Sequence, residues 1–251
     1  MMIKSEYGNI FDLRGKRALI TGSTQGIGYA IAKTFHEYGA EVYVHCSSDK
    51  EKAKRVAEEI GSRLWVTGDL SQTQAVREIY EKTGELDIVV SNVSVQVRKN
   101  WKEITDEEFE YQVNVNFKST LQLMQTYIPA MEKNNWGRFL FVGSVAQYRP
   151  NPAMSVYAAT KCAVQSLVST VAKQVAKNGV TVNSILPGVI ETPRNDEALS
   201  DVAYREKVLS GIPARFFGIP SDCAGAALVM CSEAGRYING AELLIDGGMA
   251  L

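Results

Sequence analysis

Residues that bind metals or form covalent cross-links are scarce in this sequence. Four cysteines and two histidines are spread over 251 residues, and no two cysteines form a Cys-x-x-Cys pair. Zinc sites and disulfide frameworks both need such residues at short, regular spacing. We therefore expect no metal and no disulfide framework. His36 and His45 have no further ligands at metal spacing, and we interpret them as structural or exposed.

Long hydrophobic runs and an excess of one charge are also missing. No uncharged apolar stretch reaches the roughly 18 residues that a membrane span needs, and the first residues contain no signal-peptide core. The formal net charge is −1, with acidic and basic residues interspersed. Such a surface has neither a basic stripe for nucleic acid nor a polybasic membrane anchor. We expect a cytoplasmic protein without nucleic-acid or membrane partners.

What the sequence does contain is a regular alternation of strand-like and helix-like segments. Apolar strand-like segments lie at 16–21, 40–46, 63–70, 86–92, 137–144, 180–188 and 241–248, with amphipathic segments between most of them. Alternation of this kind predicts an α/β fold, a Rossmann-like doubly wound parallel sheet with helices on both faces. No linker divides the chain, so we expect a single domain over residues 1–251. Capping-box patterns predict helix starts at Ser71 and at Thr105.

A glycine-rich turn, TGSTQGIG, joins the first predicted strand to the first predicted helix. Its glycines are Gly22, Gly26 and Gly28, spaced Gly-x-x-x-Gly-x-Gly. A helix N-terminus after such a turn offers free N–H groups and a positive dipole end to a phosphate. A glycine cluster can also be a simple tight turn, but its place between first strand and first helix favours a dinucleotide site.

A tyrosine and a lysine lie four positions apart, at Tyr157 and Lys161. Residues at i and i+4 share one face of a helix, so the ammonium can favour the phenolate form of the tyrosine. Lowering a phenol pKa by about three units needs roughly 4 kcal/mol. The alternative is a half-buried core tyrosine beside a solvated surface lysine.

These motifs together resemble the classical short-chain dehydrogenases/reductases, and the resemblance extends over essentially the entire chain. TGSTQGIG looks like their cofactor turn, and the GDL, NVNFKS and PGVIET segments are similar to further family motifs. Ser144 precedes Tyr157 by the expected thirteen positions (157 − 144), and Tyr157 with Lys161 matches Tyr-x-x-x-Lys. The resemblance implies four catalytic residues, namely Asn116, Ser144, Tyr157 and Lys161.

The same resemblance implies which residues bind the cofactor. Tyr157 and Lys161 are expected to contact it together with Gly22, Ser23, Thr24, Gln25, Gly26, Ile27, Gly28, Cys46, Ser47, Ser48, Asp69, Leu70, Asn92, Pro187, Gly188, Ile190 and Thr192. Within the single domain, residues of about 15–150 would form the cofactor half, and 151–251 the catalytic and substrate-loop half.

Two departures from the family pattern concern the cofactor. Family members usually carry Asn-Asn-Ala-Gly after the fourth strand, where this chain has SNVS at 91–94. The end of the second strand also lacks the acidic residue that would favour NAD. Ser47, Ser48 and Lys50 could accommodate a 2′-phosphate instead. We predict NADP, with NAD as the alternative.

Substrate groups are expected from segments 94–101 and 145–154 and from a mobile lid over 193–217. Arg98 and Arg149 are candidates to pair with an anionic substrate, and Phe216 or Phe217 would lie near the pocket mouth or pack the lid. The predicted function is an NAD(P)-dependent oxidoreductase that interconverts a carbonyl and a secondary alcohol on a small molecule. The alternatives are an enzyme like the 3-oxoacyl-carrier-protein reductases and a non-catalytic dinucleotide sensor. The resemblance also implies a homotetramer.

Overall fold

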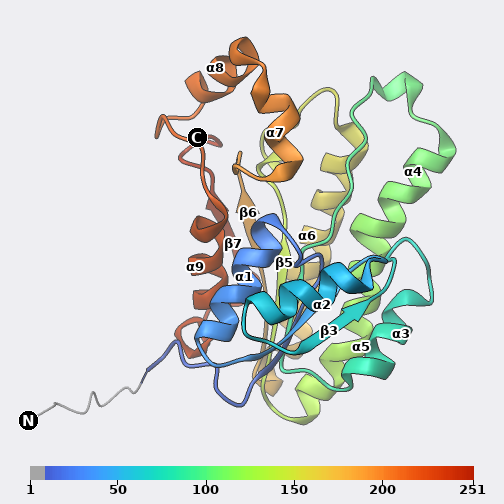
Figure 1. Ribbon diagram of the computed structural model, residues 1–251, viewed down its shortest axis with the longest axis vertical. Helices are drawn as coiled ribbons and strands as arrows, with labels where there is room; N and C mark the ends of the chain where they lie inside the picture. The colour runs from blue at the N-terminus through green and yellow to red at the C-terminus, as the bar shows by residue number, and fades with distance from the viewer. Residues whose placement is uncertain (1–8) are drawn as a thin grey trace, which may run out of the picture.

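The computed structural model describes the chain from residue 9 to residue 251. Its centre is a seven-stranded, wholly parallel sheet in the order β3-β2-β1-β4-β5-β6-β7 (Figure 1). The strands are β1 (Arg17–Ile20), β2 (Glu41–Cys46), β3 (Leu64–Thr67), β4 (Ile88–Ser91), β5 (Gly137–Val142), β6 (Val180–Pro187) and β7 (Glu242–Ile245). The order reverses between β1 and β4, so the sheet is doubly wound, and the predicted fold is confirmed.

Helices cover both faces of this sheet, because successive strand residues point to opposite sides. Ala18 and Ile20 of β1 pack into one core, whereas Leu19 between them packs into the other. The first core is covered by α1 (Gly26–Glu37), α2 (Lys50–Glu59) and α9 (Pro220–Cys231). The second is covered by α3 (Ala75–Thr83), α5 (Ser119–Lys133) and α6 (Ser155–Val175). The inner strands are therefore buried from both sides, whereas β7 at the end of the sheet stays largely exposed.

The helix starts show where local sequence patterns were reliable. Thr105 caps α4 (Asp106–Val113) with a complete capping box to Glu108, as predicted. The box predicted at Ser71 is wrong: α3 begins at Ala75, and no side chain caps it. Instead, the Ser71 N–H donates to Asp69 Oδ1 at 3.0 Å, so the serine belongs to a local turn after β3.

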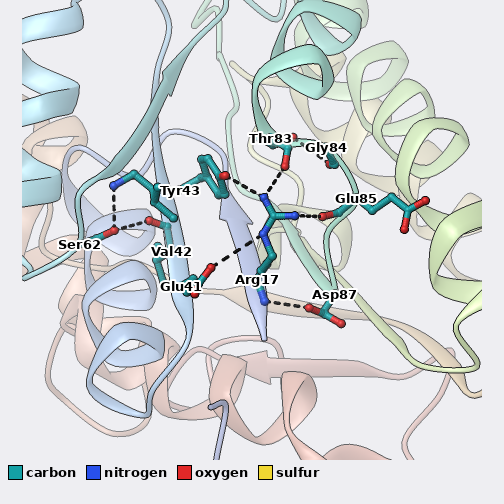
Figure 2. Close-up of polar contacts among 10 residues, drawn as sticks. Arg17, Glu41, Val42, Tyr43, Ser62, Thr83, Gly84, Glu85 and Asp87 are labelled. Atoms are coloured by element: carbon teal, nitrogen blue, oxygen red, sulfur yellow. Dashed lines mark hydrogen bonds and ion pairs between the residues drawn. The ribbon is translucent and has the colours of Figure 1, made fainter. Parts of the chain in front are cut away.

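A network around Arg17 joins three strands at the amino edge of the sheet (Figure 2). The guanidinium donates to Tyr43 Oη at 2.8 Å, to the Thr83 carbonyl at 2.6 Å and to the Glu85 carbonyl at 2.7 Å. The Arg17 main-chain N–H donates to Asp87 Oδ2 at 2.9 Å. One side chain thus anchors the first residue of β1 to β2 and to the segment leading into β4.

The opposite, carboxyl edge of the sheet carries two additional helices, α7 (Pro193–Ser200) and α8 (Val202–Ser210) (Figure 1). They follow β6 and occupy the segment predicted to be a lid. Over residues 9–251, no helix is both long and apolar enough to cross a membrane.

Candidate active site

The glycine turn lies at the carboxyl end of β1, and α1 starts inside it at Gly26. Gly22 and Gly26 have φ values of 64° and 58°, in the left-handed region that favours glycine. The N-terminus of α1 has no side-chain cap and no acidic residue in its first turn. Gly26, Ile27 and Gly28 line a large cavity, so the uncapped N–H groups of this helix end can receive a phosphate, which fits the predicted dinucleotide.

Asn92 fixes this turn against the end of β4. Its Nδ2 donates to the Thr21 carbonyl at 2.9 Å and to the Gly22 carbonyl at 3.3 Å. A Cβ at Gly28 would lie 2.5 Å from both Asn92 Nδ2 and the Gly22 oxygen. Glycine is therefore needed at position 28 so that the helix can pack closely on the turn.

His45 joins the glycine turn to the loop after β3. The Gly22 N–H donates to His45 Nδ1 at 3.0 Å, so Nδ1 carries no hydrogen, and Nε2–H donates to the Gly68 carbonyl at 3.0 Å. Burial lowers the pKa of His45 to about 4 and keeps the ring neutral. His45 is thus structural, and sequence reasoning missed that it shapes the cavity wall. Only the neutral ring can accept from Gly22, so its tautomer is defined by the fold.

The end of the cavity next to β2 has the features of an adenosine site. It is lined by Cys46, Ser47, Asp69 and Leu70, and their contacts with a cofactor stay predictions. The cation there is Lys52 and not the expected Lys50. Asp49 caps α2 by accepting from the Lys52 N–H, and the Lys52 ammonium reaches Gln25 Oε1 at 3.1 Å.

Tyr157 and Lys161 lie on α6 at the other end of the same cavity, and both are buried. The Lys161 ammonium lies 5.6 Å from the Tyr157 ring centre and donates to the Val142 carbonyl at 2.7 Å. Burial first, and then the positive charge of Arg194, lower the pKa of Lys161 to about 7. The alternative of a solvated surface lysine is therefore wrong.

Ser144 follows β5 and lines the cavity with Tyr157 and Lys161. Its Oγ accepts from the Ala146 N–H at 3.1 Å, and its main-chain N–H donates to Gln147 Oε1 at 3.0 Å. These bonds orient the side chain while leaving its hydroxyl hydrogen available for an acceptor in the cavity.

Asn116 occupies a different place from the other three predicted catalytic residues. It lies in a π-helical turn, Asn114–Lys118, between α4 and α5, and is not among the residues lining the cavity. Its side chain exchanges two bonds with the main chain of Val95, of 2.8 and 2.9 Å, and donates to Thr160 Oγ1 at 3.1 Å. It therefore holds the loop after β4 against α6, and a direct catalytic role stays a prediction.

Most other predicted cofactor contacts face one cavity of about 1020 Å³. Those that line it are Gly22, Thr24, Gln25, Gly26, Ile27, Gly28, Cys46, Ser47, Asp69, Leu70, Asn92, Pro187, Gly188, Ile190 and Thr192. Ser23 and Ser48 are not among the lining residues. Ser23 is buried, and its N–H and hydroxyl both bind the main chain of His45, at 3.1 and 2.9 Å. Their contacts with a cofactor stay predictions.

Comparison with known proteins agrees with this geometry. The family model described as enoyl-(acyl carrier protein) reductase matches residues 22–250. Dehydrogenase/reductase SDR family member 4 of Sus scrofa is 33% identical over 95% of this chain and 88% of its own. The 3-oxoacyl-[acyl-carrier-protein] reductase of Aquifex aeolicus is 33% identical over 94% of this chain and 98% of its own. The chain belongs to the short-chain dehydrogenase/reductase family.

Solved structures of family members give the same result. A 3-oxoacyl (acyl-carrier-protein) reductase from Agrobacterium tumefaciens with NADP bound superposes with a TM-score of 0.91, at 32% identity and 95% coverage of both chains. A gluconate 5-dehydrogenase from Burkholderia cenocepacia, in complex with NADP and tartrate, gives 0.89 at 29% identity, covering 96% of this chain and 97% of its own. The predicted fold and the predicted class of oxidoreductase, acting between carbonyl and alcohol groups, are confirmed by this membership.

Ser94, the last residue of the SNVS segment that departs from the family pattern, is hydrogen-bonded to the lid. The Arg194 guanidinium, at the start of α7, donates to Ser94 Oγ at 2.8 Å and to the Ser94 carbonyl at 2.5 Å. Both residues line the cavity. The side chain that replaces the usual glycine therefore joins the loop after β4 to the lid.

The lid of this short-chain dehydrogenase/reductase has a small core of its own. Phe217 is buried against Leu199 and Ile212, which confirms packing of the lid, whereas Phe216 is 62% exposed. Neither phenylalanine lines the cavity, so the expected place at the pocket mouth is wrong. Arg98 and Arg149 do line it, and their contact with a substrate stays a prediction.

Proposed function

We propose that the protein catalyses the NADP-dependent interconversion of a carbonyl and a secondary alcohol on a small molecule. The observation that carries this proposal is the burial of Tyr157 and Lys161, beside Ser144, in the cavity that also contains the glycine turn. A dinucleotide with its phosphates at Gly26 and Ile27 would extend along that cavity toward Tyr157.

Each of the three side chains has a distinct role in this reaction. When bound, NADPH supplies the hydride that reduces the carbonyl carbon. Tyr157 gives its phenolic proton to the carbonyl oxygen, so the products are the alcohol and NADP⁺. Ser144 donates to the same oxygen and stabilises its developing charge. Lys161 places its positive charge beside the Tyr157 ring and, by family resemblance, holds the nicotinamide ribose. In the oxidative direction Tyr157 accepts the proton.

NADP is favoured over NAD by the residues at the β2 end of the cavity. Cys46 and Ser47 line it where an NAD-binding relative would carry an acid, and the Lys52 ammonium is next to them. A 2′-phosphate would meet a cation and a hydroxyl there, with no carboxylate at position 46, 47 or 48 to repel it. Both solved relatives described above contain NADP.

The test compares the wild-type protein with Tyr157→Phe, which removes one hydroxyl and keeps the buried ring. We expect turnover of a carbonyl panel to fall by about 100-fold or more, because the proton donor is lost. The affinity for NADPH, measured by its fluorescence on titration, should stay within about twofold. A non-catalytic sensor, the other class of function, would bind NADPH and show no turnover that depends on Tyr157.

An activity toward acyl thioesters is the second candidate, because two of the relatives described above are 3-oxoacyl-carrier-protein reductases. Turnover of a 3-oxoacyl thioester with NADPH, compared with the free keto acid, separates this candidate from an enzyme of small soluble substrates.

The proposed assembly is a cytoplasmic homotetramer without nucleic-acid or membrane partners. Apolar side chains are exposed on α4 and β7, including Phe109, Leu243 and Leu244, at 50%, 39% and 38%. Such side chains favour burial against a second copy. The four separate free cysteines agree with a reducing compartment. Sedimentation of the purified protein tests the tetramer: a monomer would contradict it.

A further inference from the structure

The charges that line the cavity are strongly unbalanced. The whole chain has 27 basic and 28 acidic residues. Among the lining residues that the structure describes, the basic ones are Lys52, Arg98, Arg149, Lys161, Arg194 and Lys207, and the acidic one is Asp69. A cleft with one sign of charge concentrates ligands of the opposite sign.

Three of these cations have no role in the proposed cofactor site. Lys52 and Asp69 lie at the adenosine end, Lys161 is beside Tyr157, and Arg194 binds Ser94. The remaining three are Arg98, Arg149 and Lys207, which we call the cationic rim.

The cationic rim is assembled around α8. Arg98 Nη2 donates to the Tyr204 hydroxyl at 3.4 Å. Tyr204 lies one helical turn before Lys207, and Gly211 lies one turn after it. The Gly211 carbonyl accepts from Arg149 Nη1 at 3.3 Å. The three cations therefore converge on one lid helix from the loops after β4 and β5 and from α8 itself.

The rim is also close to the reacting position. Arg149 follows Ser144 by five residues through a tight turn, in which the Arg149 N–H donates to the Val145 carbonyl at 2.8 Å. At the rise of a helical turn, five residues span roughly 8–10 Å. A molecule of four to six carbons is long enough to place its carbonyl at Ser144 and a charged end at the rim.

Among the side chains that the structure describes, no acidic one forms an ion pair with the rim. The ion pairs that these side chains form do not include Arg98, Arg149 or Lys207. Arg149 uses Nη1 for the Gly211 and Met249 carbonyls, which fixes the guanidinium and leaves its other donors for a ligand. Cations that share one cavity wall repel each other, and a bound anion would relieve that repulsion.

We propose that the substrate is a small hydroxy or keto acid, whose carboxylate binds Arg98, Arg149 and Lys207. The inference rests on the proposed function and specifies its substrate class. Guanidinium groups match the two oxygens of a carboxylate, and Lys207 adds a point charge. Gln96 and Asn151, which line the same cavity, can bind hydroxyl groups on the chain between carboxylate and carbonyl.

The experiment compares two substrates that differ only in charge at one end. Gluconate and glucitol have the same six-carbon polyol chain, and glucitol carries an alcohol in place of the carboxylate. With NADP, we expect KM for gluconate to be at least about tenfold lower, and to rise with ionic strength as charge attraction is screened. A panel of four- to six-carbon keto acids and their methyl esters extends the comparison to reduction.

The variants Arg98→Gln and Lys207→Gln test the rim itself. Each should raise KM for the acid by about fivefold, with little change for the uncharged partner, because one charged hydrogen bond is lost. Lys207→Arg should restore much of the affinity. Lys177→Gln is the matched control: it removes the same charge from an exposed site at the amino edge of the sheet.

The outcomes separate this inference from the proposed function. Turnover can depend on Tyr157 and yet be equal for acids and esters, or be restricted to acyl thioesters. Either result contradicts the proposed substrate class and still supports the proposed oxidoreductase activity. If no substrate turns over, calorimetry with tartrate in the presence of NADP decides. Binding that Lys207→Gln weakens supports the carboxylate site, and no binding, or binding that the variant leaves unchanged, overturns it.

Discussion

The Arg194 guanidinium donates to both the hydroxyl and the carbonyl of Ser94, at 2.8 and 2.5 Å, and thereby ties the lid to the loop after β4. Both residues line the cavity that the cofactor would enter. A bond between a charged donor and a neutral acceptor contributes about 1.5–3 kcal/mol.

Ser94→Ala should weaken NADPH binding by about fivefold, mainly through faster dissociation, because the lid loses the hydroxyl bond but keeps the bond from Arg194 to the carbonyl of residue 94. Stopped-flow displacement of NADPH measures this rate. When Ser94→Ala is introduced into the Arg194→Gln variant, the dissociation rate of NADPH should increase little further, as expected for two residues of one contact. A gain in affinity on Ser94→Ala would mean instead that the side chain obstructs the cofactor.

Lys52→Gln should lower affinity for NADPH about tenfold and leave NADH nearly unchanged. The ammonium lies where a 2′-phosphate would bind, and that phosphate is the one group by which the two cofactors differ. Parallel titrations with both reduced cofactors measure the effect. Lys50→Gln, two residues away on the same helix but outside the cavity lining, is the control and should change neither constant.

His45 makes stability depend on pH in a defined direction. Its pKa in the folded protein is about 4, against an ordinary value of 6.5. Between these values the unfolded chain binds the proton and the folded chain does not, so stability falls as pH falls from about 6.5 to 4. The loss approaches about 3 kcal/mol at the lower limit.

Denaturant unfolding at pH 7 and pH 5 tests this dependence. His45→Gln removes the titrating ring and should flatten the slope relative to wild type, although it also loses bonds at Gly22 and Gly68. Equal slopes in the two proteins would show that His45 is protonated as easily when folded as when unfolded.

The architecture could be predicted from the sequence because it follows from a local, periodic pattern of apolar and polar residues. Apolar segments such as 86–92 and 137–144, separated by amphipathic ones, leave few options besides a parallel sheet covered on both faces. Tyr157 and Lys161 were predicted together because residues at i and i+4 share one helix face, whereas Ser144 was predicted from the family resemblance.

Contacts between distant segments could not be predicted from the sequence in this way. His45 meets Gly22 and Gly68 only because β1, β2 and β3 end at the same edge of the sheet. Lys52, and not the predicted Lys50, lines the cavity, because the direction of each side chain depends on where α2 begins after its cap Asp49. Arg194 and Ser94 lie a hundred positions apart, and no local pattern couples them.

Lys161→Met should abolish turnover and stabilise the protein. Burial holds the Lys161 pKa near 7, so the ammonium is costly in its site, and stability rises with pH between about 7 and 10.5 as the unfolded chain keeps the proton. A buried methionine carries no such cost. We expect an increase of about 1–3 kcal/mol in unfolding free energy at pH 7. A less stable variant would show that the bond to Val142 and the contact with the Phe141 ring outweigh burial.

Arg17→Met should lower the unfolding free energy by about 2 kcal/mol, because it leaves the Tyr43 hydroxyl and the Thr83 and Glu85 carbonyls without their donor (Figure 2). Cofactor affinity should not change, since the network lies at the edge of the sheet away from the cavity. Arg77→Met removes an exposed helical ion pair and is the control, with an expected loss below about 0.5 kcal/mol. Comparable losses in both variants would contradict a special role for Arg17.

The last residues of the chain take part in the substrate side of the molecule. Met249 lines the cavity, and its carbonyl accepts from Arg149 Nη1 at 2.6 Å. The position of a purification tag is therefore a kinetic variable for this enzyme. A tag fused after Leu251 would lie two residues from the Met249 carbonyl that holds Arg149, whereas the first described residues lie at the other end of the molecule (Figure 1).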